Sequence, residues 1–436
     1  MKLPFIGLTL FLTFVYFEPS IFFPWLAHVR AAFIISILTL IAAVAAGVRL
    51  PKAIQNKLLI LLLIIAILSL YLSPLPIRAD NYTNLSYLYK TLALYFLVAI
   101  IISSKDYLVK FYYMTIGFGF VVSITTLLTF RAGRGSLKGA DLDRMVNYFG
   151  GIGDDSNEFG ALMVMLFPLP AVLIAGEKSW IKKILFSIIA VSFLLCITRS
   201  RSRGAFVGLL ITFTFLLWEN RKKAGIIFIS ILMLTYTYFN THQSFWDRFA
   251  TLQSMETIET ERNVFSRVVQ NRQSVELMKR YPITGVGLGN FVLAKIYILK
   301  LAPVTEGELK GFVKFTAHNS YLSMGAETGV IGLLIFLLII ITSIWYCYSS
   351  ERYFKTRDDL LLFYKISQST RFGLIGFAFC MIFLSVQFNL MLYQFIAITA
   401  VLKNLAEKEK AAELPLFNPK NGLNIQAKKP TQPPFQ

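Results

Sequence analysis

The feature that most constrains this chain is a succession of long apolar segments separated by polar connections. About twelve such segments divide the 436 residues. Their approximate limits are residues 4–17, 29–48, 57–73, 87–103, 108–129, 158–176, 183–198, 204–218, 224–239, 318–347, 372–386 and 389–402. Because about 20 consecutive apolar residues cross a bilayer, the pattern predicts an all-α, polytopic membrane protein of about 12 transmembrane helices. Charged residues make up only 15% of the chain, against about 25% in soluble domains, which argues against a soluble enzyme.

The placement of lysine and arginine predicts the orientation of the chain. Their excess lies on alternate connections, which face the cytoplasm if the N-terminus does. These connections are residues 49–57, 104–110, 177–183, 219–223, 351–371 and the tail from 403. The first apolar segment lacks a small-residue cleavage site, so we expect it to be retained as a helix.

Four regions are therefore expected. They are transmembrane helices 1–9 in residues 1–239, a periplasmic loop domain in 240–317, transmembrane helices 10–12 in 318–402, and a disordered cytoplasmic tail in 403–436.

The net charge of the chain and the positions of its cysteines limit which partners and cofactors can be expected. A formal net charge of +19 in a membrane chain indicates contact with membrane lipids or anionic substrates, and no helix suits a DNA groove, so no nucleic acid is expected. The three cysteines lie inside apolar runs without metal-ligand spacing, which predicts packing residues. There is no phosphate-binding loop, nucleophile elbow or zinc motif, so no cofactor is expected, although a carboxylate-bound cation stays open.

Three arginines, Arg199, Arg201 and Arg203, stand between two apolar segments on the side that should be poor in positive charge. They could be interfacial anchors whose aliphatic stems lie along the membrane. A phosphate site is the sharper hypothesis, because a guanidinium donates paired hydrogen bonds and keeps its charge at any pH. Arg199 and Arg203 would share a face if the segment were helical, and Gly204 would let a ligand approach the backbone.

The long loop carries a second basic element. Residues 261–281 have apolar side chains at helical steps and a basic face that includes Arg267, which predicts an amphipathic helix on or near the membrane interface. Pro282 ends that helix. The following glycine-rich stretch, residues 284–291, has GxGxG spacing without a preceding strand, so a tight, flexible connector is expected rather than a dinucleotide site.

His318 is the sharpest candidate for chemistry. It is one of only three histidines, and we expect it in the first turn of a long helix, whose N-terminal dipole disfavours the imidazolium form. A neutral histidine there is suited to take a proton from a hydroxyl. The alternative is a helix-capping polar cluster with Asn319. Glu327 would lie about 13 Å deeper along the helix and needs a partner, for which one of the arginines is a candidate.

Asp154 and Asp155 precede another apolar segment. The pair suggests a cation site or paired carboxylates, but a capping box in which Asp155 or Ser156 starts the next helix is the favoured interpretation.

Taken together, these motifs resemble the O-antigen ligase/polymerase family. The resemblance rests on Ser202-Arg203-Gly204, Ser266-Arg267, the stretch from Pro282 to Phe291, His318-Asn319-Ser320-Tyr321-Leu322 and Glu327-Thr328-Gly329, in that order. Residues 155–160 resemble the family's Asp-Pro-Asn-Asp-like segment, with Ser156 and Glu158 departing from it. The signature covers roughly residues 150–345.

The resemblance implies a glycosyltransferase of the bacterial inner membrane. Such an enzyme takes a glycan from undecaprenyl diphosphate on the periplasmic face and joins it to an acceptor hydroxyl, without a metal. Arg203 and Arg267 would bind the diphosphate, and His318 would activate the acceptor, with Asn319 and Glu327 in support. A diphosphate-binding role for Arg199 and Arg201 rests on charge and position alone.

Several alternatives remain at this point. The layout favours a ligase with a lipid A-core acceptor, but a polysaccharide polymerase or a protein O-oligosaccharyltransferase fits the same motifs. A transporter or flippase of lipid-linked glycan should carry charges across many spans, whereas the predicted spans are nearly free of charge. A non-catalytic scaffold would leave His318 and the arginines replaceable.

Overall fold

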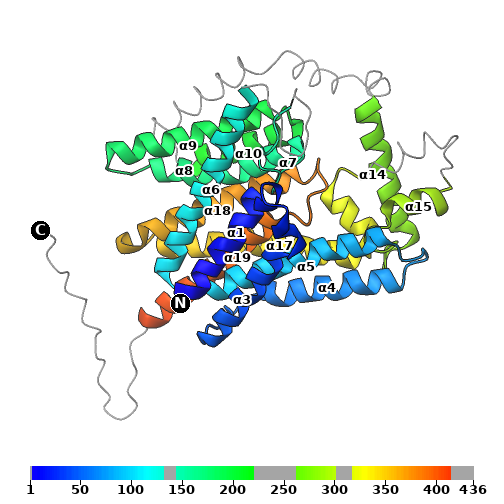
Figure 1. Ribbon diagram of the computed structural model, residues 1–436, viewed down its shortest axis with the longest axis horizontal. Coiled ribbons are helices and arrows are strands. Elements are labelled where there is room, and N and C mark those ends of the chain that lie inside the picture. Colours follow the sequence, from blue (N-terminus) through cyan, green and yellow to red (C-terminus); the bar gives the residue numbers. More distant parts are fainter. Residues whose placement is uncertain (1, 132–143, 220–261, 301–316, 414–436) are drawn as a thin grey trace, which may run out of the picture.

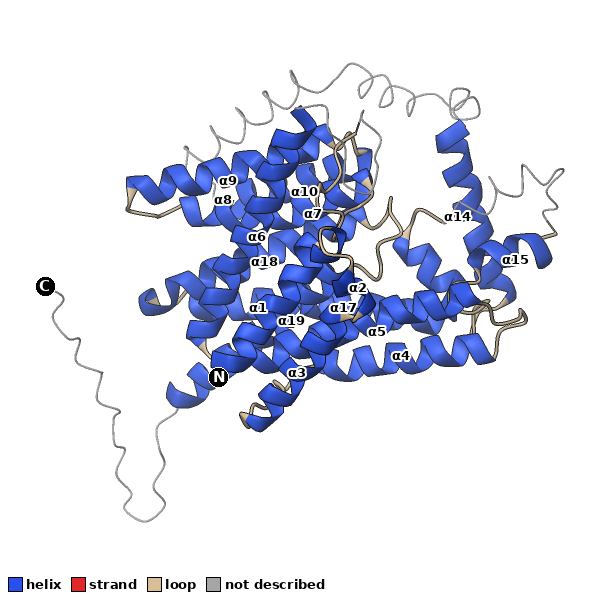
Figure 2. Ribbon diagram, in the orientation of Figure 1, coloured by secondary structure: helices blue, strands red, loops and turns tan. Residues whose placement is uncertain are grey.

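The computed structural model describes residues 2–131, 144–219, 262–300 and 317–413. Within these ranges the chain forms helices joined by loops, and no strand (Figure 2). The longer helices are α1 (Lys2–Phe17), α3 (Ala31–Ala45), α4 (Ile54–Tyr71), α5 (Ala79–Ile101), α6 (Lys105–Arg131), α7 (Ser156–Leu166), α9 (Trp180–Arg199), α10 (Arg203–Glu219), α14 (Arg262–Arg280), α17 (Ser320–Phe354), α18 (Leu361–Cys380) and α19 (Leu390–Glu413). The shorter ones are α2 (Trp25–His28), α8 (Pro168–Ile174), α15 (Phe291–Tyr297) and the 3₁₀ turns η1 (Pro19–Ile21) and η2 (Asp358–Leu360).

The apolar helices confirm the predicted class of fold, an all-helical polytopic membrane protein. Seven helical stretches of the described chain are long and apolar enough to cross a membrane, and α1 and α3 are shorter apolar helices. A helix satisfies its own backbone N–H and C=O groups, which is what a segment in lipid requires. The predicted count of 12 is not reproduced, and the predicted segment 224–239 lies outside the described residues.

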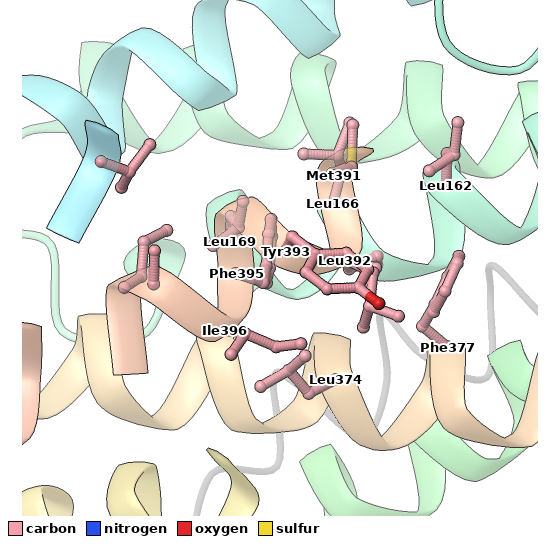
Figure 3. Packing of buried hydrophobic residues seen from close by; sticks show 14 of the residues in the cluster. Leu162, Leu166, Leu169, Leu374, Phe377, Met391, Leu392, Tyr393, Phe395 and Ile396 are labelled. Atoms are coloured by element: carbon pink, nitrogen blue, oxygen red, sulfur yellow. The ribbon is translucent and has the colours of Figure 1, made fainter. Parts of the chain in front are cut away.

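The core of the bundle lies where α19 crosses α7, α8 and α18. Figure 3 shows apolar side chains of all four helices meeting there. They are Leu162, Leu166, Leu169, Leu374, Phe377, Met391, Leu392, Phe395 and Ile396, together with Tyr393. All of these side chains are buried, so α19 is an enclosed helix rather than one that faces lipid. Helix α17 packs against α18, α4 and α19 and completes this half of the bundle.

One predicted span is wrong. The segment 372–386 was expected to be a span after a cytoplasmic connection at 351–371, but α18 begins at Leu361 and ends at Cys380. The residues from Met381 to Asn389 form a non-helical loop, which we call the α18–α19 loop. Two polar residues in the part of α18 that was predicted as a connection, Gln368 and Arg371, are paired with residues of neighbouring helices.

The clearest of these polar residues is Arg371, in the middle of α18. Its guanidinium is buried, donates to a Glu351 carboxylate oxygen at 2.8 Å and forms an ion pair with Glu219 at the end of α10. A charge can be buried when it is paired and hydrogen-bonded in this way. Each of the seven candidate spans has an 18-residue window with at most two charged residues, as predicted, and Arg371 of α18 is a buried exception outside them.

Candidate functional site

Three helices begin close together at one end of the bundle, which we call the site end: α7, α10 and α17. The α18–α19 loop joins them. The Ser320 N–H donates to the Met381 carbonyl at 2.9 Å, and the Ser320 hydroxyl donates to the Leu384 carbonyl at 2.6 Å. The Asn389 amide of the same loop donates to Glu158 of α7. This loop therefore fixes the start of α17 relative to that of α7.

The start of α10 is held by the same loop. A Cβ atom built on Gly204 would lie 3.0 Å from Cβ of Phe383, so the loop passes close to the backbone of α10 at this glycine. Arg203, the first residue of α10, is thereby placed beside the start of α17.

His318 lies one residue before the N-cap of α17, and not in its first turn as predicted. Asn319 is the N-cap, and its side-chain oxygen accepts hydrogen bonds from the N–H groups of Tyr321 and Leu322, both at 3.0 Å. The backbone of His318 has a φ of 47°, in the left-handed region. This turn directs the chain into the helix and leaves the imidazole half-buried at the site end.

The pKa of His318 is lowered from its ordinary value, first by burial and then by the nearby charges of Arg267 and Lys295. The charge of Asp155 acts in the opposite direction. Burial and the nearby cations therefore favour the neutral form of the imidazole. The sequence predicted a neutral histidine but ascribed it to the helix dipole.

Arginines from two distant segments approach each other at this point. Burial lowers the pKa of Arg267, and the charges of Arg203 and Arg144 lower it further. Such mutual effects require the guanidinium groups to be close, since screened charges act over short distances. Arg203 at the start of α10 and Arg144 therefore lie within electrostatic range of Arg267 on α14, and Arg267 lies within range of His318. We refer to the three arginines as the arginine cluster.

Arg144 was not identified from the sequence. Its Nε donates to the Ser200 carbonyl at 3.2 Å, and its Nη2 donates to the Asn157 side-chain oxygen at 2.8 Å. The residue therefore ties the α9–α10 connection to the start of α7. A single arginine in a loop carries little signal in the sequence, and only its contacts with both segments distinguish it.

Arg199 and Arg201 are placed differently from Arg203. Arg199 is the exposed last residue of α9, and its carbonyl accepts the Met145 N–H at 3.2 Å. Arg201 is half-buried, with a left-handed φ of 50°. The segment is not a continuous helix, because α9 ends before α10 begins. The predicted shared face of Arg199 and Arg203 is therefore wrong.

Glu327 is not deeper in a straight helix, and its partner is not an arginine. Gly329 has φ 74° and ψ 178°, which breaks α17 two residues after Glu327. The Glu327 side chain is buried and accepts hydrogen bonds from the backbone N–H groups of Gly289 and Phe291. It therefore holds the chain at the start of α15, where the Phe291 N–H would otherwise lack a helical partner. The predicted depth of about 13 Å assumed an unbroken helix.

The glycine-rich stretch is tight, as predicted, but it is packed rather than flexible. The N–H groups of Val286 and Gly287 donate to the Ala326 and Glu327 carbonyls, both at 2.9 Å. Gly285 has φ 65°, and a Cβ there would clash with the Glu327 backbone. Residues 282–290 are therefore docked on the break in α17.

The chain between the end of α4 and the first turn of α5 contacts the other side of residues 282–290. The Asn81 amide donates to the Leu288 carbonyl at 2.6 Å, and the Ser73 hydroxyl donates to the Val286 carbonyl at 2.6 Å. The stretch leads directly from α14, so these contacts also fix the position of Arg267.

Helix α14 was predicted over residues 261–281 and is observed at Arg262–Arg280. Figure 1 shows it standing beside the bundle with α15 near its lower end. It packs along the first part of α17: Gly325 has no room for a Cβ because of the Met278 side chain. Most of the rest of the predicted loop domain 240–317 lies outside the described residues.

Two further residues complete the surroundings of His318. Lys295 of α15 is buried, with its ammonium 5.2 Å from the centre of the Phe291 ring, and burial lowers its pKa to about 8. Asp155 is the N-cap of α7, as predicted, and its carboxylate accepts hydrogen bonds from the N–H groups of Asn157 and Glu158. In the part of the chain that the structure describes, no group of three or more His, Cys, Asp or Glu side chains is arranged to hold a metal ion.

These features define a class of protein: a polytopic helical membrane protein with a half-buried neutral histidine beside an arginine cluster. A comparison with protein families identifies that class further. Residues 184–337, about a third of the chain, match the family described as O-Antigen ligase, and this segment is similar to that family. The matched region runs from α9 into α17 and includes Arg203, Arg267 and His318. A search of curated proteins gave no significant match.

The family supports a function of the ligase or polymerase type, in which a glycan is transferred. It implies a glycosyltransferase-like enzyme of a bacterial membrane, with a glycan-linked lipid as donor and a separate acceptor.

Proposed function

We propose that this protein transfers a glycan from undecaprenyl diphosphate to an acceptor hydroxyl at the periplasmic face of the bacterial inner membrane. The observation that carries the proposal is that Arg203 and Arg144 lie near Arg267, which in turn lies near His318, whose neutral form is favoured. Arginine and histidine in this combination fit the two needs of the reaction, a stabilised diphosphate leaving group and a base for the acceptor.

The arginine cluster would bind the diphosphate. Each guanidinium can donate paired hydrogen bonds to phosphate oxygens, and burial strengthens these interactions. The negative charge on the leaving diphosphate grows as its bond to the anomeric carbon breaks, so the arginines would stabilise the transition state more than the bound donor. The charge is neutralised by guanidinium groups, and we therefore propose a reaction that requires no metal.

His318 would act as the general base. An acceptor hydroxyl would give its proton to the imidazole while its oxygen attacks the anomeric carbon, and the diphosphate would leave with the bonding electron pair. A base must be neutral before it can accept the proton, and burial together with Arg267 and Lys295 favours the neutral form by lowering the pKa of His318. A positioned base typically contributes 10²- to 10⁴-fold to the rate.

Asn319 and Glu327 would support the site without touching the reacting atoms. Asn319 caps the helix that follows His318, and Glu327 holds the segment that leads from Arg267 to α15. Arg199 and Arg201 would contribute positive charge at its edge.

Activity of the His318→Ala variant tests the proposal. The purified variant should fold and insert as the wild type does, but its transfer rate should fall about 10²-fold or more. His28→Ala is a matched control, because His28 is exposed and lies on the short helix α2. Near wild-type transfer by His318→Ala would contradict the assignment of the base.

Lipid A-core is the acceptor we propose first, as the layout of the chain favoured. A second lipid-linked repeat or a protein hydroxyl would fit the same chemistry, because nothing in the arginine cluster selects among hydroxyl acceptors. Supplying one donor with each acceptor in turn distinguishes the three, and product with the lipid A-core alone is the expected result.

A further inference from the structure

Two glutamates from different helices share one arginine at the end of α10 that lies opposite the site end. Arg371 of α18 donates through its Nη2 atom to both oxygens of Glu219, at 2.5 and 2.7 Å. The same Nη2 atom lies 2.8 Å from Oε2 of Glu351, which also accepts a hydrogen bond from the Arg371 Nε at 2.8 Å. One guanidinium therefore holds a carboxyl group of α10 and a carboxyl group of α17 together.

These two side chains, which we call the carboxyl pair, also contact each other. Both place an oxygen within 2.8 Å of a single nitrogen atom, and Glu219 and Glu351 are hydrogen-bonded to each other. An ionised carboxylate can only accept hydrogen bonds, so a bond between two carboxyl groups requires a proton on one of them. The geometry therefore has a place for one proton between the two glutamates.

The balance of charge also favours a proton at this position. The side chains of Arg371 and Glu351 are only 6% and 8% exposed. Two ionised carboxylates beside one guanidinium would leave one negative charge without compensation, and an uncompensated buried charge is strongly unfavourable. A single proton restores neutrality.

The other described groups around the carboxyl pair add no second positive charge. Tyr364 of α18 lies close to both glutamates, and on α17 the Tyr348 ring lies against the Arg371 guanidinium, with 5.6 Å between the ring centre and Cζ. Cys347 of α17 is a buried neighbour of Arg371 and Glu351. Tyrosine and cysteine are uncharged at neutral pH, so in the described part of the chain Arg371 is the cation whose charge acts on Glu351.

Glu219 connects the carboxyl pair with solvent. Its side chain is 24% exposed, whereas that of Glu351 is 8% exposed. The Gln368 amide donates to Oε2 of Glu219 at 3.1 Å and so holds this carboxyl group at the boundary. A proton can therefore enter and leave through Glu219, at the opposite end of α10 from Arg203.

We propose that Glu219 and Glu351 form a proton-binding site, in which one proton is shared between the carboxyl groups and Arg371 balances the remaining charge. Release of this proton to water through Glu219 would leave two carboxylates on one guanidinium. Their repulsion would weaken the contact of α10, which begins with Arg203, with α17, which follows His318. The inference does not depend on the proposed function, because a proton site needs no substrate.

Infrared difference spectroscopy of the full-length protein in vesicles tests the inference. A protonated carboxyl group has a C=O stretching band that a carboxylate lacks. We expect this band in the wild type at neutral pH and its loss in both Glu351→Gln and Glu219→Gln, because the carboxyl group that remains in each variant ionises to balance Arg371. Each single variant should still fold, since one carboxylate is enough to pair with the guanidinium. Glu407→Gln is the matched control, because Glu407 is an exposed carboxylate paired with Lys403.

Wild-type spectra that neither variant of the carboxyl pair changes would overturn the inference. Loss of the band in one variant alone would also overturn it, because a shared proton needs both carboxyl groups.

Thermal unfolding at several pH values gives a second readout. The folded carboxyl pair holds a proton that two free glutamates release above about pH 4.3 in the unfolded chain. The folded state then binds more protons than the unfolded state, so raising the pH favours unfolding, by up to about tenfold in the equilibrium constant per pH unit. The unfolding temperature of the wild type should therefore fall more steeply with pH than that of Glu351→Gln.

Equal pH dependence of the wild type and Glu351→Gln would contradict the inference. A stabilisation of the wild type by sodium over choline at equal ionic strength, absent from Glu351→Gln, would also overturn it and indicate a metal cation in place of the proton.

Discussion

Replacement of Glu327 by alanine should release the segment that carries Arg267. The Glu327 carboxylate is buried and accepts two hydrogen bonds, from the N–H groups of Gly289 and Phe291. A hydrogen bond contributes about 0.5–1.5 kcal/mol, and about 1.5–3 kcal/mol when the acceptor is charged, so losing both should cost the docking of this segment about 1–6 kcal/mol. Glu327→Gln keeps an acceptor oxygen and loses the charge, and should cost roughly half as much.

Hydrogen exchange measures this effect directly. A cost of about 1–6 kcal/mol corresponds to a fall of about 5- to 10⁴-fold in the protection of backbone amides, which we expect in residues 282–297 of Glu327→Ala. Transfer should fall by at least about 10-fold, because Arg267 loses its fixed position although Glu327 touches no substrate. Glu276→Gln is the control: Glu276 forms an exposed ion pair with Arg280 on α14 and should change neither quantity.

Wild-type protection of residues 282–297 in Glu327→Ala would refute the reasoning. It would mean that contacts of α4 and α5 alone hold the segment, so that the buried carboxylate contributes nothing to the position of Arg267.

Three other predictions concern single residues of the site. Arg203→Lys keeps the charge but loses the paired hydrogen bonds, and transfer in a steady-state assay should fall about 10- to 150-fold; full activity would make the arginine an anchor only. Lys295→Met removes a charge that lowers the pKa of His318, so the acid limb of the pH–rate profile should move to higher pH. Asp155→Asn removes a charge that raises this pKa, so the acid limb should move to lower pH. Shifts of both variants in the same direction would be evidence against His318 as the base. Gly329→Ala should lower the thermal unfolding temperature, because the φ of Gly329 is 74° and a Cβ there would meet the Ile283 carbonyl; an unchanged temperature would show that the break in α17 tolerates a side chain.

The class of fold could be predicted because hydrophobicity is a local property of the sequence. Segments of about 20 apolar residues were visible directly, and the helix of residues 262–280 followed from its amphipathic period. The prediction of a span at 372–386 was wrong because it also used only the local sequence. The charge of Arg371 indicated a polar connection between helices. Its burial inside α18 depends on ion pairs with Glu219 and Glu351, which lie far away in the sequence.

The candidate site was only partly predictable. Arg203 stood out because it lies on the side expected to be poor in positive charge, His318 because the chain has only three histidines, and Arg267 because of the Ser266-Arg267 motif. Arg144 did not stand out, because its importance comes from tertiary contacts with Ser200 and Asn157.

The role of Glu327 was misjudged for a different physical reason. The sequence cannot show that Gly329 adopts a positive φ, since glycine occupies both halves of φ space with similar ease. Once the helix breaks there, the carboxylate reaches the start of α15 and not the arginine cluster.

An experimental structure with bound undecaprenyl diphosphate tests the central claim most directly. The account predicts that guanidinium groups of Arg203 and Arg267 donate to the diphosphate oxygens and that the His318 imidazole faces the space beside them. Diphosphate density away from both arginines, or an imidazole turned out of that space, would contradict it.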